Sequence, residues 1–580
     1  MLFLKNASNG LKKKNIILVN NFSDPTTKKN LTDKGYIYEE FKLHDTSEKL
    51  IIGFHEAKNV YNKFIKKIKA ELEKVSKKKI DIKIIHLIFS KWLFYYISNN
   101  YYKYQILLKI KKKYPNCALV DIKDKKINED DKLFTNSHTT ILNFNLLKNI
   151  GKYMGIKIVE TKLSQIQKFI FFIPSAANKR NRFSINIYIK YFISRISIII
   201  SKLFYRDIVF MHEDVLNFSN IIKIIFKSKF KFAYLSFQEN HNLEPKSYPQ
   251  FSQLEIKSTN HFEKILLKNF SNYIPVSILS LIDYIQSENE NKNENKKNIR
   301  KKNIIISKRF FGAEFINFKK YIIKNFKKNR LVSYQHGGLY GQEVNYFPEI
   351  AERLISHYFA SWGWKGKNIF TLPLEKKNNN EKQVTGGYCL VVANSSGNHF
   401  LSLGNNPESI LNHQMKQTRE LLIEILKKKS LILRLPNYGH YWREHAYFSK
   451  INQLKIDNHK KNFVQMALGS DYVIHNHFNT TSFETLSLNI PTLIYSPKII
   501  CKFNSEATRY LKKLIKVNIF FYSHSDLVKF LKKNNFDLKS WWNQEKVQEV
   551  RRDFLKNYCN SLHDWPNEWM TKLSIINKQI

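Results

Sequence analysis

Short runs of apolar residues recur along the chain, separated by longer stretches in which apolar positions have helical spacing. The runs do not alternate with polar residues, which is typical of strands buried on both faces of a parallel sheet. We predict strands at Asn15–Val19, Asp207–Met211, Phe232–Phe237, Ile304–Ser307, Leu331–Gln335, Tyr388–Ala393, Ser430–Leu435, Tyr472–His475 and Thr492–Tyr495. A helix is predicted over Pro407–Lys429. The alternation of strand and helix indicates α/β architecture with more than one doubly wound unit.

Two apolar stretches, Ile84–Ile97 and Tyr191–Tyr205, are long enough to raise the question of membrane contact. Lys91 interrupts the first, and Arg195 and Lys202 interrupt the second. No window reaches about 18 uncharged apolar residues, the length that a membrane-spanning helix needs. We therefore expect each stretch to be a buried helix or strand, with contact to a membrane surface as the alternative.

Two polar segments, Ser287–Asn303 and Glu375–Gln383, divide the chain, because they contain too few apolar residues to fold alone. We expect an N-terminal α/β domain over 1–286, a linker or loop at 287–303 and the remainder of the N-terminal domain at 304–374. A second Rossmann-like domain is expected at 384–540, followed by C-terminal helices at 541–580.

The charge of the chain suggests an anionic partner. Its 580 residues include 96 Lys and Arg against 48 Asp and Glu, a formal net charge of +48. Such a charge is found in proteins that bind nucleic acid or anionic membranes. Here it is spread in short Lys runs through a sequence rich in Asn and Ile, which favours compositional bias and solvated helix faces. The four cysteines stand far apart, which argues against a disulfide framework or a zinc site and favours a reducing compartment.

The segment at 470–496, SDYVIHNHFNTTSFETLSLNIPTLIYS, contains the strongest candidate site. A strand runs into a polar loop, and a helix begins at Thr480 or Thr481. Thr481 and Glu484 have the spacing of a capping box, which alone would account for both residues. A helix that begins beyond the carboxyl end of a strand also lies where open α/β sheets bind ligands, and its free amides favour an anion. The pattern favours contact between a diphosphate and Thr480, Thr481 and Ser482, with Glu484 accepting from ribose hydroxyls.

The segment at 331–341, LVSYQHGGLYG, is the second candidate. A predicted strand ends at Gln335 and His336 and meets Gly337 and Gly338, in a chain with only 17 glycines. Paired glycines allow positive φ and close approach of the backbone to a ligand. Histidine at this position could act as a general base or contact a phosphate. The alternative is a glycine turn with an incidental histidine.

Weaker candidates follow three other strands. Arg434 ends a strand and could bind phosphate through forked hydrogen bonds or pair with a neighbouring acid. Ser395 and Ser396 lie in the turn ANSSGNH, which could hold a phosphate or only reverse the chain. His475 and His477 suggest a metal, but no third ligand is in view, so we expect no metal and treat His477 as a candidate nucleotide contact. The absence of G-x-G-x-x-G and P-loop motifs gives no support to NAD or ATP binding there.

Three segments in combination carry a family resemblance: SYQHGGLYG (333–341), LRLPNYGHYW (433–442) and HFNTTSFETLSLNIPTLIY (477–495). They resemble a bacterial family of transferases tied to surface-carbohydrate synthesis and related to capsule- and teichoic-acid-type transferases. The closing HDWPNEW (563–569) also fits this family. The resemblance covers residues 304–569 well, whereas over 1–286 only the general plan is similar.

The resemblance implies a GT-B-like α/β fold. Two Rossmann-like domains would face a cleft, the C-terminal one would hold the nucleotide, and the C-terminal helices would cross back to the first domain. Many relatives have Gly before the Pro that follows the 480s helix, where this chain has Asn489-Ile490-Pro491. Asn tolerates the left-handed conformation at a helix end, so we expect the geometry to be kept.

The resemblance also implies an activity, namely metal-independent transfer of a sugar or sugar-like group from a nucleotide-activated donor, without a cofactor. The acceptor would be a cell-surface polysaccharide, such as O-antigen or capsule, or a glycolipid. Thr480, Thr481 and Glu484 match the GT-B helix start that contacts diphosphate and ribose. His336 would be an acceptor-side base or phosphate contact, and Arg434 would help neutralise the leaving phosphate.

Other functions remain open. A polyol-phosphate transferase or a nucleotide-sugar epimerase would use nearly the same residues on the same fold, and a nucleic-acid-binding protein would use the charge. We expect no specific nucleic acid as partner. We expect a cytoplasmic location, with contact at the inner face of the membrane as a further possibility.

Overall fold

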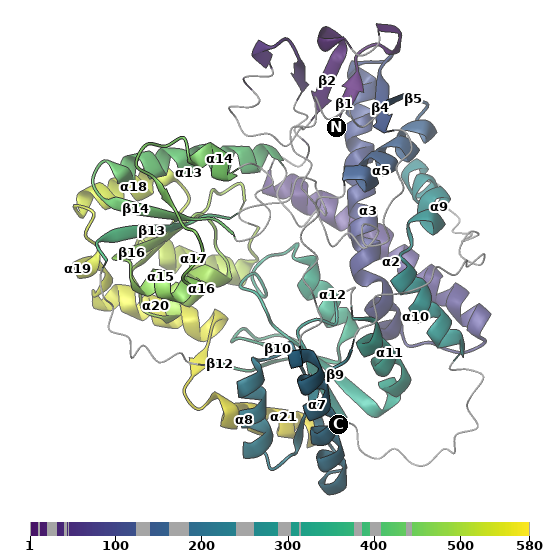
Figure 1. The fold of residues 1–580 in the computed structure, drawn as a ribbon, viewed down its shortest axis with the longest axis vertical. Coiled ribbons are helices and arrows are strands. Elements are labelled where there is room, and N and C mark those ends of the chain that lie inside the picture. The colour runs from purple at the N-terminus through teal and green to yellow at the C-terminus, as the bar shows by residue number, and fades with distance from the viewer. Residues whose placement is uncertain are drawn as a thin grey trace.

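The computed structural model describes residues 2–9, 12–19, 29, 32–39, 43, 46–122, 140–161, 185–238, 260–287, 303–312, 315–375, 386–394, 408–436, 444–500 and 502–578. Within these ranges the chain forms one five-stranded sheet, two six-stranded sheets and a two-stranded ribbon. We call the large sheets the N-terminal, middle and C-terminal sheets. Figure 1 shows the C-terminal sheet on one side of the molecule and the N-terminal sheet at one end of the other side.

The N-terminal sheet has the strand order β3-β2-β1-β4-β5. Its strands are β1 (Leu2–Leu4), β2 (Ile16–Val19), β3 (Ile37–Glu39), β4 (Ala118–Ile122) and β5 (Lys157–Thr161). The first strand runs antiparallel to both of its neighbours, whereas the two outer pairs are parallel. The long helix α3 (Ile82–Lys113) extends from this sheet toward the middle of the molecule, where the long helix α2 (Ser47–Ser76) packs across it (Figure 1).

Helix α3 is the centre of the N-terminal core. Ile85, Leu87, Ile88 and Ile97, which point in different directions around the helix, are all buried. A helix that is apolar all round belongs inside a protein, so the burial expected for Ile84–Ile97 is confirmed. Helices α5 (Thr140–Tyr153), α9 (His261–Tyr273) and α10 (Val276–Ser287) pack against it.

The middle sheet is parallel throughout, in the order β11-β10-β9-β8-β6-β7. Its strands are β6 (Val209–His212), β7 (Phe232–Leu235), β8 (Asn303–Ser307), β9 (Asn329–Tyr334), β10 (Tyr358–Ser361) and β11 (Ile369–Thr371). Its helices are α7 (Ile185–Phe204), α8 (Phe218–Lys227), α11 (Ile316–Asn325) and α12 (Phe347–Ile355). Because β6 pairs with β8, the sheet spans the polar segment 287–303. The region 1–286 therefore contributes to two sheets, and 288–302 lies outside the described residues.

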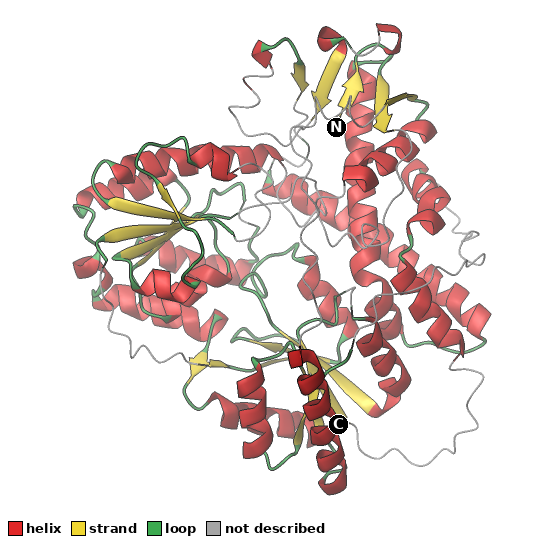
Figure 2. Ribbon diagram, in the orientation of Figure 1, coloured by secondary structure: helices red, strands yellow, loops and turns green. Residues whose placement is uncertain are grey.

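The C-terminal sheet is also parallel, in the order β15-β14-β13-β16-β17-β18. Its strands are β13 (Tyr388–Val392), β14 (Ser430–Arg434), β15 (Lys455–Ile456), β16 (Tyr472–His475), β17 (Thr492–Tyr495) and β18 (Phe520–Phe521). Figure 2 shows helices on both faces of this sheet. They are α13 (Glu408–Leu426), α14 (Glu444–Phe448), α15 (Phe463–Leu468), α16 (Thr480–Ser487), α17 (Ser505–Lys516), α18 (His524–Lys533), α19 (Lys539–Trp542) and α20 (Glu545–Tyr558).

The end of the chain returns to the middle sheet. Strand β12 (Leu374–Glu375) pairs in parallel with β19 (Ser561–Leu562), and α21 (Trp565–Lys578) follows. Trp565 and Trp569 of α21 are buried in the core beneath β6, β8 and β9, and the Trp569 indole donates to the Pro373 carbonyl at 2.8 Å. The protein is thus an α/β protein with two parallel sheets and a C-terminal helix that crosses back, as the GT-B resemblance implied.

The nine strands predicted from apolar runs are all confirmed, with boundaries that differ by at most two residues, and Pro407–Lys429 contains α13. Among the described residues, no single helix is long and apolar enough to cross a membrane, although α9 and α10 pass the test as a pair bent by 81°. The stretch Tyr191–Tyr205 lies mostly in α7, and the burial expected for it is wrong for its outward face, where Phe192 is 65% and Leu203 is 74% exposed.

Candidate functional site

Gln335 begins the turn that follows β9, and its carboxamide makes three hydrogen bonds within the protein. Its backbone N–H donates to the Ala360 carbonyl at 2.9 Å. Its carboxamide donates to the Gly337 carbonyl at 2.8 Å and accepts from the Trp362 N–H and the Trp364 indole, both at 2.9 Å. These bonds fasten the turn to the end of β10. Gln335 therefore orients the turn, and its contact with a ligand stays a prediction.

His336 follows, with 37% of its side chain exposed. The Tyr340 hydroxyl lies 3.1 and 3.2 Å from the two imidazole nitrogens and donates to the buried Glu352 carboxyl at 3.1 Å. Burial raises the pKa of Glu352 well above its ordinary value, which favours the protonated carboxyl. Burial and the nearby Lys308 lower the pKa of His336 to about 4. The imidazole is therefore neutral near pH 7, which is the form that can accept a proton.

Gly338 brings the two strongest sequence motifs together. Its N–H donates to the Thr480 side-chain oxygen at 3.0 Å. A Cβ at position 338 would lie only 2.7 Å from the Thr480 nitrogen and 2.8 Å from the Asn479 carbonyl carbon. The turn after β9 and the start of α16 are thus in direct backbone contact, and the carboxyl ends of the middle and C-terminal sheets meet there. The close approach predicted for the paired glycines is present, and Gly338 makes it to the other sheet's helix.

Helix α16 begins two residues earlier than a Thr481 cap would place it. Asn479 is the N-cap and accepts from the Thr481 N–H at 3.3 Å. The capping box joins Asn479 to Ser482, whose hydroxyl accepts from the Asn479 N–H at 3.2 Å. The predicted capping pair of Thr481 and Glu484 is therefore wrong, because Asn479 also has a capping side chain and the chain path places it at the helix start.

The hydroxyl of Thr481 lies within a cluster of buried polar groups. The Thr481 oxygen is 3.2 Å from His477 Nε2 and 3.4 Å from His475 Nδ1. His475 Nε2 is 3.1 Å from the Thr485 hydroxyl, and His477 Nδ1 is 2.9 Å from Asn476 Oδ1. Burial lowers the pKa of His477 to about 4, so the ring is neutral near pH 7. The described residues contain no group of three or more His, Cys, Asp and Glu side chains that could hold a metal.

Arg434 ends β14, and its guanidinium donates to the Asp457 carboxylate and, at 3.3 Å, to the Lys461 carbonyl. Of the two roles left open by the sequence, the ion pair is present, and the phosphate contact stays a prediction. On the neighbouring strand, the Asn394 N–H donates to Asn476 at 2.8 Å, which joins the turn after β13 to the loop before α16. Ser395 and Ser396 lie outside the described residues.

Glu484 lies one turn into α16, half-buried, with interactions inside the protein, and its contact with ribose stays a prediction. The end of the helix agrees with the expectation for Asn489, which has φ of +57°. The Trp542 indole donates to the Asn489 carbonyl at 3.1 Å, so a partner from α19 holds this left-handed residue. Asn489 thus adopts the left-handed conformation expected at this helix end.

Charged residues that the sequence analysis did not single out lie beyond β6 and β8. Asp214 accepts from the Lys308 N–H at 3.1 Å, and its other oxygen lies 3.1 Å from His212 Nδ1. Burial raises the pKa of Asp214, but His212 and these hydrogen bonds outweigh burial and hold this pKa below its ordinary value. The charges of Lys308, Arg309 and Asp214 all act on the pKa of His336. These residues follow two predicted strands directly, and their position at the carboxyl ends of those strands would have been enough to predict them as site residues from the sequence.

A family model described as LIC12162 family transferase matches residues 2–573 of the chain. The chain belongs to this family of transferases. No curated protein sequence matches it.

The transferase is also similar to several solved structures. A variant of TarM from S. aureus, in a complex that contains UDP, is 10% identical over 47% of this chain and 55% of its own, with a TM-score of 0.31. The wall teichoic acid polymerase TagF is 12% identical over 69% of this chain and 99% of its own, with a TM-score of 0.31. MurG from Acinetobacter baumannii is 10% identical over 64% of this chain and 100% of its own, also with a TM-score of 0.31.

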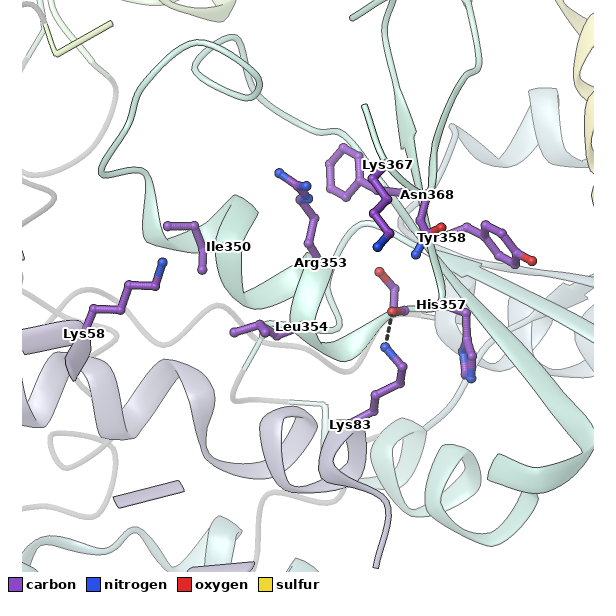
Figure 3. Close-up of a pocket in the computed structure, with 11 residues that line it drawn as sticks. Lys58, Lys83, Ile350, Arg353, Leu354, His357, Tyr358, Lys367 and Asn368 are labelled. Atoms are coloured by element: carbon purple, nitrogen blue, oxygen red, sulfur yellow. Dashed lines mark hydrogen bonds between the residues drawn. The ribbon is translucent and has the colours of Figure 1, made fainter. Parts of the chain in front are cut away.

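A separate pocket of about 380 Å³ lies at the amino ends of β10 and β11 of the transferase (Figure 3). Its cations come from three helices and one turn, namely Lys58 of α2, Lys83 of α3, Arg353 of α12 and Lys367. The Lys83 ammonium donates to the Ser356 carbonyl at 2.7 Å, which is the dashed line in Figure 3. None of its described lining residues is acidic, and none belongs to the sequence motifs, which lie at the opposite ends of the strands.

Proposed function

We propose that this transferase moves a sugar or sugar-like group from a nucleotide-activated donor to a cell-surface polysaccharide, such as O-antigen or capsule, or to a glycolipid. The observation that carries the proposal is the contact between Gly338 and Thr480. It joins a neutral, half-exposed histidine from one parallel sheet to the helix start of the other. Ligands of open parallel sheets bind at these carboxyl ends, so donor and acceptor can be held on the two sides of one contact.

The donor side is formed by α16. Its amino end offers backbone N–H groups and a favourable dipole to a diphosphate. The Ser482 hydroxyl both accepts from and donates to the Asn479 backbone, and the Thr481 hydroxyl donates to the Asn479 side chain. The Thr480 hydroxyl accepts from the Gly338 N–H and can still donate its proton, so Thr480 is the best placed of the three hydroxyl residues. Glu484, one turn further along, would accept from the ribose hydroxyls. His477, which lies beside Thr481, would orient that hydroxyl toward the diphosphate.

The acceptor side is formed by the turn after β9. Neutral His336 would take the proton of the acceptor hydroxyl as its oxygen forms a bond to the donor carbon. The bond between that carbon and the donor phosphate breaks in the same step, and its electron pair leaves with the nucleotide. Lys308 and Arg309, together with Arg434 and the helix dipole, would offset the added negative charge. Asp214 would position the Lys308 backbone rather than touch the substrate.

A transfer assay tests this proposal. The purified chain is incubated with UDP-, GDP-, CMP- and CDP-linked donors and a lipid-linked glycan acceptor, and the released nucleotide is identified. We expect acceptor-dependent release of the whole nucleotide from one donor. The variant His336→Ala should lose about 10²–10⁴-fold in rate, the usual contribution of a general base, while its thermal midpoint stays near that of wild type. The exposed His55 of α2 offers the matched control His55→Ala.

Each outcome separates the alternatives. Full activity in His336→Ala would remove the base assignment. Release of CMP from a CDP-linked polyol would indicate a polyol-phosphate transferase, because the cleaved bond then lies between the two phosphates. Conversion of a nucleotide sugar without an acceptor would indicate an epimerase. Failure of every donor would contradict the proposal as a whole.

A further inference from the structure

Helix α7 presents bulky apolar side chains to solvent in a regular stripe. Ile189, Phe192, Ile196, Ile199 and Leu203 are between 41% and 74% exposed, and their spacings alternate between three and four residues. At 3.6 residues per turn, these five positions lie within an arc of about 80°. Isolated exposed apolar residues are common, but a continuous stripe of this kind marks an interaction surface.

The opposite face of α7 explains why the apolar face points outward. Ser194, Ser197 and Ser201 are buried against β7, the edge strand of the middle sheet. The Ser194 hydroxyl donates to the Tyr234 carbonyl at 2.9 Å, and Ser197 accepts from the Tyr234 N–H at 3.1 Å. Ser194 and Ser197 therefore satisfy backbone groups that an uncovered edge strand would leave unpaired. The packing that closes the sheet edge leaves the apolar residues of α7 to another partner.

The stripe continues onto the neighbouring helix. The Tyr205 hydroxyl, just after α7, donates to the Lys229 carbonyl at 2.9 Å, which places the end of α7 beside the turn that follows α8. Phe204 is 73% exposed at this end of α7, and Phe226 in the last turn of α8 is 65% exposed. The apolar surface therefore spans the ends of both helices. Figure 1 shows α7 and α8 together at the lower end of the molecule, away from the C-terminal sheet.

The charges around the stripe are almost all positive. Neither α7 nor α8 contains an Asp or a Glu, whereas Arg195 and Lys202 of α7 and Lys223 and Lys227 of α8 are exposed. Three acids contact α8 or the segments beside it. Asp207 pairs with Lys231 at 3.4 Å, the exposed Asp564 lies 4.0 Å from Lys227, and the exposed Glu375 accepts from Asn220 of α8 at 2.7 Å. An apolar stripe bordered by Lys and Arg is the pattern of a helix that lies in the plane of an anionic membrane surface.

We propose that the α7 stripe docks the transferase onto a bilayer that contains anionic phospholipid, with α7 lying in the interface. A second copy of the chain is a poorer occupant, because a symmetric contact through this face would place cations against cations without an acid on either helix. The docking surface goes beyond the proposed function, although it would bring the enzyme to a lipid-linked acceptor.

Vesicle sedimentation with the full chain tests the docking surface and needs neither donor nor acceptor, so its failure is distinct from failure of the proposed transfer. Wild-type protein should bind vesicles containing phosphatidylglycerol more tightly than pure phosphatidylcholine vesicles. The double variant F192S/L203S keeps every charge of the +48 chain, and we expect its partition onto phosphatidylglycerol vesicles to fall about tenfold or more. The matched control Ile52→Ser changes an isoleucine of α2 that is 58% exposed and should bind as wild type does.

Equal binding of F192S/L203S and wild type would overturn the proposal, because non-specific attraction by the net charge would then explain the binding. Failure of the wild type to bind vesicles would also overturn it. Light scattering should show that the wild-type protein is a monomer. If the wild type is instead a dimer and F192S/L203S is a monomer, the stripe is the contact between two copies of the chain. Unchanged thermal midpoints are expected for the variants because the side chains are exposed.

Discussion

Gly338→Ala is the substitution that most sharply probes the contact between the two sheets. The new Cβ would lie 2.7 Å from the Thr480 nitrogen, 2.8 Å from the Asn479 carbonyl carbon and 3.1 Å from the Asn479 Cα. All three are backbone atoms, so no side-chain rotation relieves the clash. The neighbouring Gly337 is a matched control, because a Cβ there would approach the Tyr340 ring only to 3.5 Å, an ordinary contact. Neither glycine has a positive φ, so alanine adds no backbone strain at either position.

The expected size of the effect follows from these contacts. Overpacking of this kind costs about 1–3 kcal/mol, and loss of a hydrogen bond such as that from the Gly338 N–H to Thr480 costs about 0.5–1.5 kcal/mol. Together these costs come to about 1.5–4.5 kcal/mol against the closed contact. Gly337→Ala should change stability by less than about 1 kcal/mol in either direction.

The assay compares thermal midpoints and nucleotide affinity for the two variants and for Thr480→Val, which removes only the hydroxyl acceptor. We expect Gly338→Ala to lower both quantities, Thr480→Val to have a smaller effect of about 1 kcal/mol, and Gly337→Ala to match wild type. Indistinguishable behaviour of Gly338→Ala and Gly337→Ala would refute the claim that the contact joins the two halves of the site.

The remaining predictions concern protonation. Because the pKa of His336 is about 4, the rate contribution of His336 to transfer should not change between pH 8 and about pH 5 and should fall only as pH drops through about 4. A fall in transfer rate near pH 6.5 would contradict the neutral-base assignment. Lys308→Met removes a cation that lowers the pKa of His336, so the fall in transfer rate at acid pH should move to higher pH. An unchanged pH for this fall would show that the charge of Lys308 does not act on His336. Glu352 has a raised folded pKa, so its contribution to stability is fully present below the unfolded value and is lost as pH rises toward the folded value. Glu352→Gln should therefore remove a loss of stability with rising pH that begins above the ordinary glutamate pKa and amounts to at most about 1.4 kcal/mol per pH unit, measured by denaturant unfolding. Parallel curves of stability against pH for variant and wild type would mean that the pKa of Glu352 is not raised.

The parts of the fold that the sequence predicted are those in which local pattern and burial agree. Strands such as β13 and β16 are covered on both faces, so they read as unbroken apolar runs. Strands of two or three residues, such as β15 and β18, carry too little pattern to be recognised. Of the N-terminal sheet only β2 was predicted, since β1 and β3 have three residues each and the five-residue strands β4 and β5 include charged side chains.

The candidate site divides in a similar way. The two motifs could be placed at strand ends from the sequence, but only the tertiary structure shows that Gly338 contacts Thr480. The run from Asn479 to Ser482 offers four residues able to cap a helix, and the chain path decides among them. In α7 the serines at 194, 197 and 201 had helical spacing and already marked the inward face, yet apolar residues on the other side were expected to be the buried ones.

The most direct test of the central claim is a thermal-shift screen of the full chain against UDP, GDP, CMP, CDP and their common sugar conjugates. A ligand that binds the folded state raises the unfolding midpoint by linkage. Binding at the start of α16 predicts a clear rise with one nucleotide class and its loss in Glu484→Ala. No rise with any nucleotide, alongside binding of RNA that weakens steeply with salt, would contradict it and assign the function to the charge of the chain.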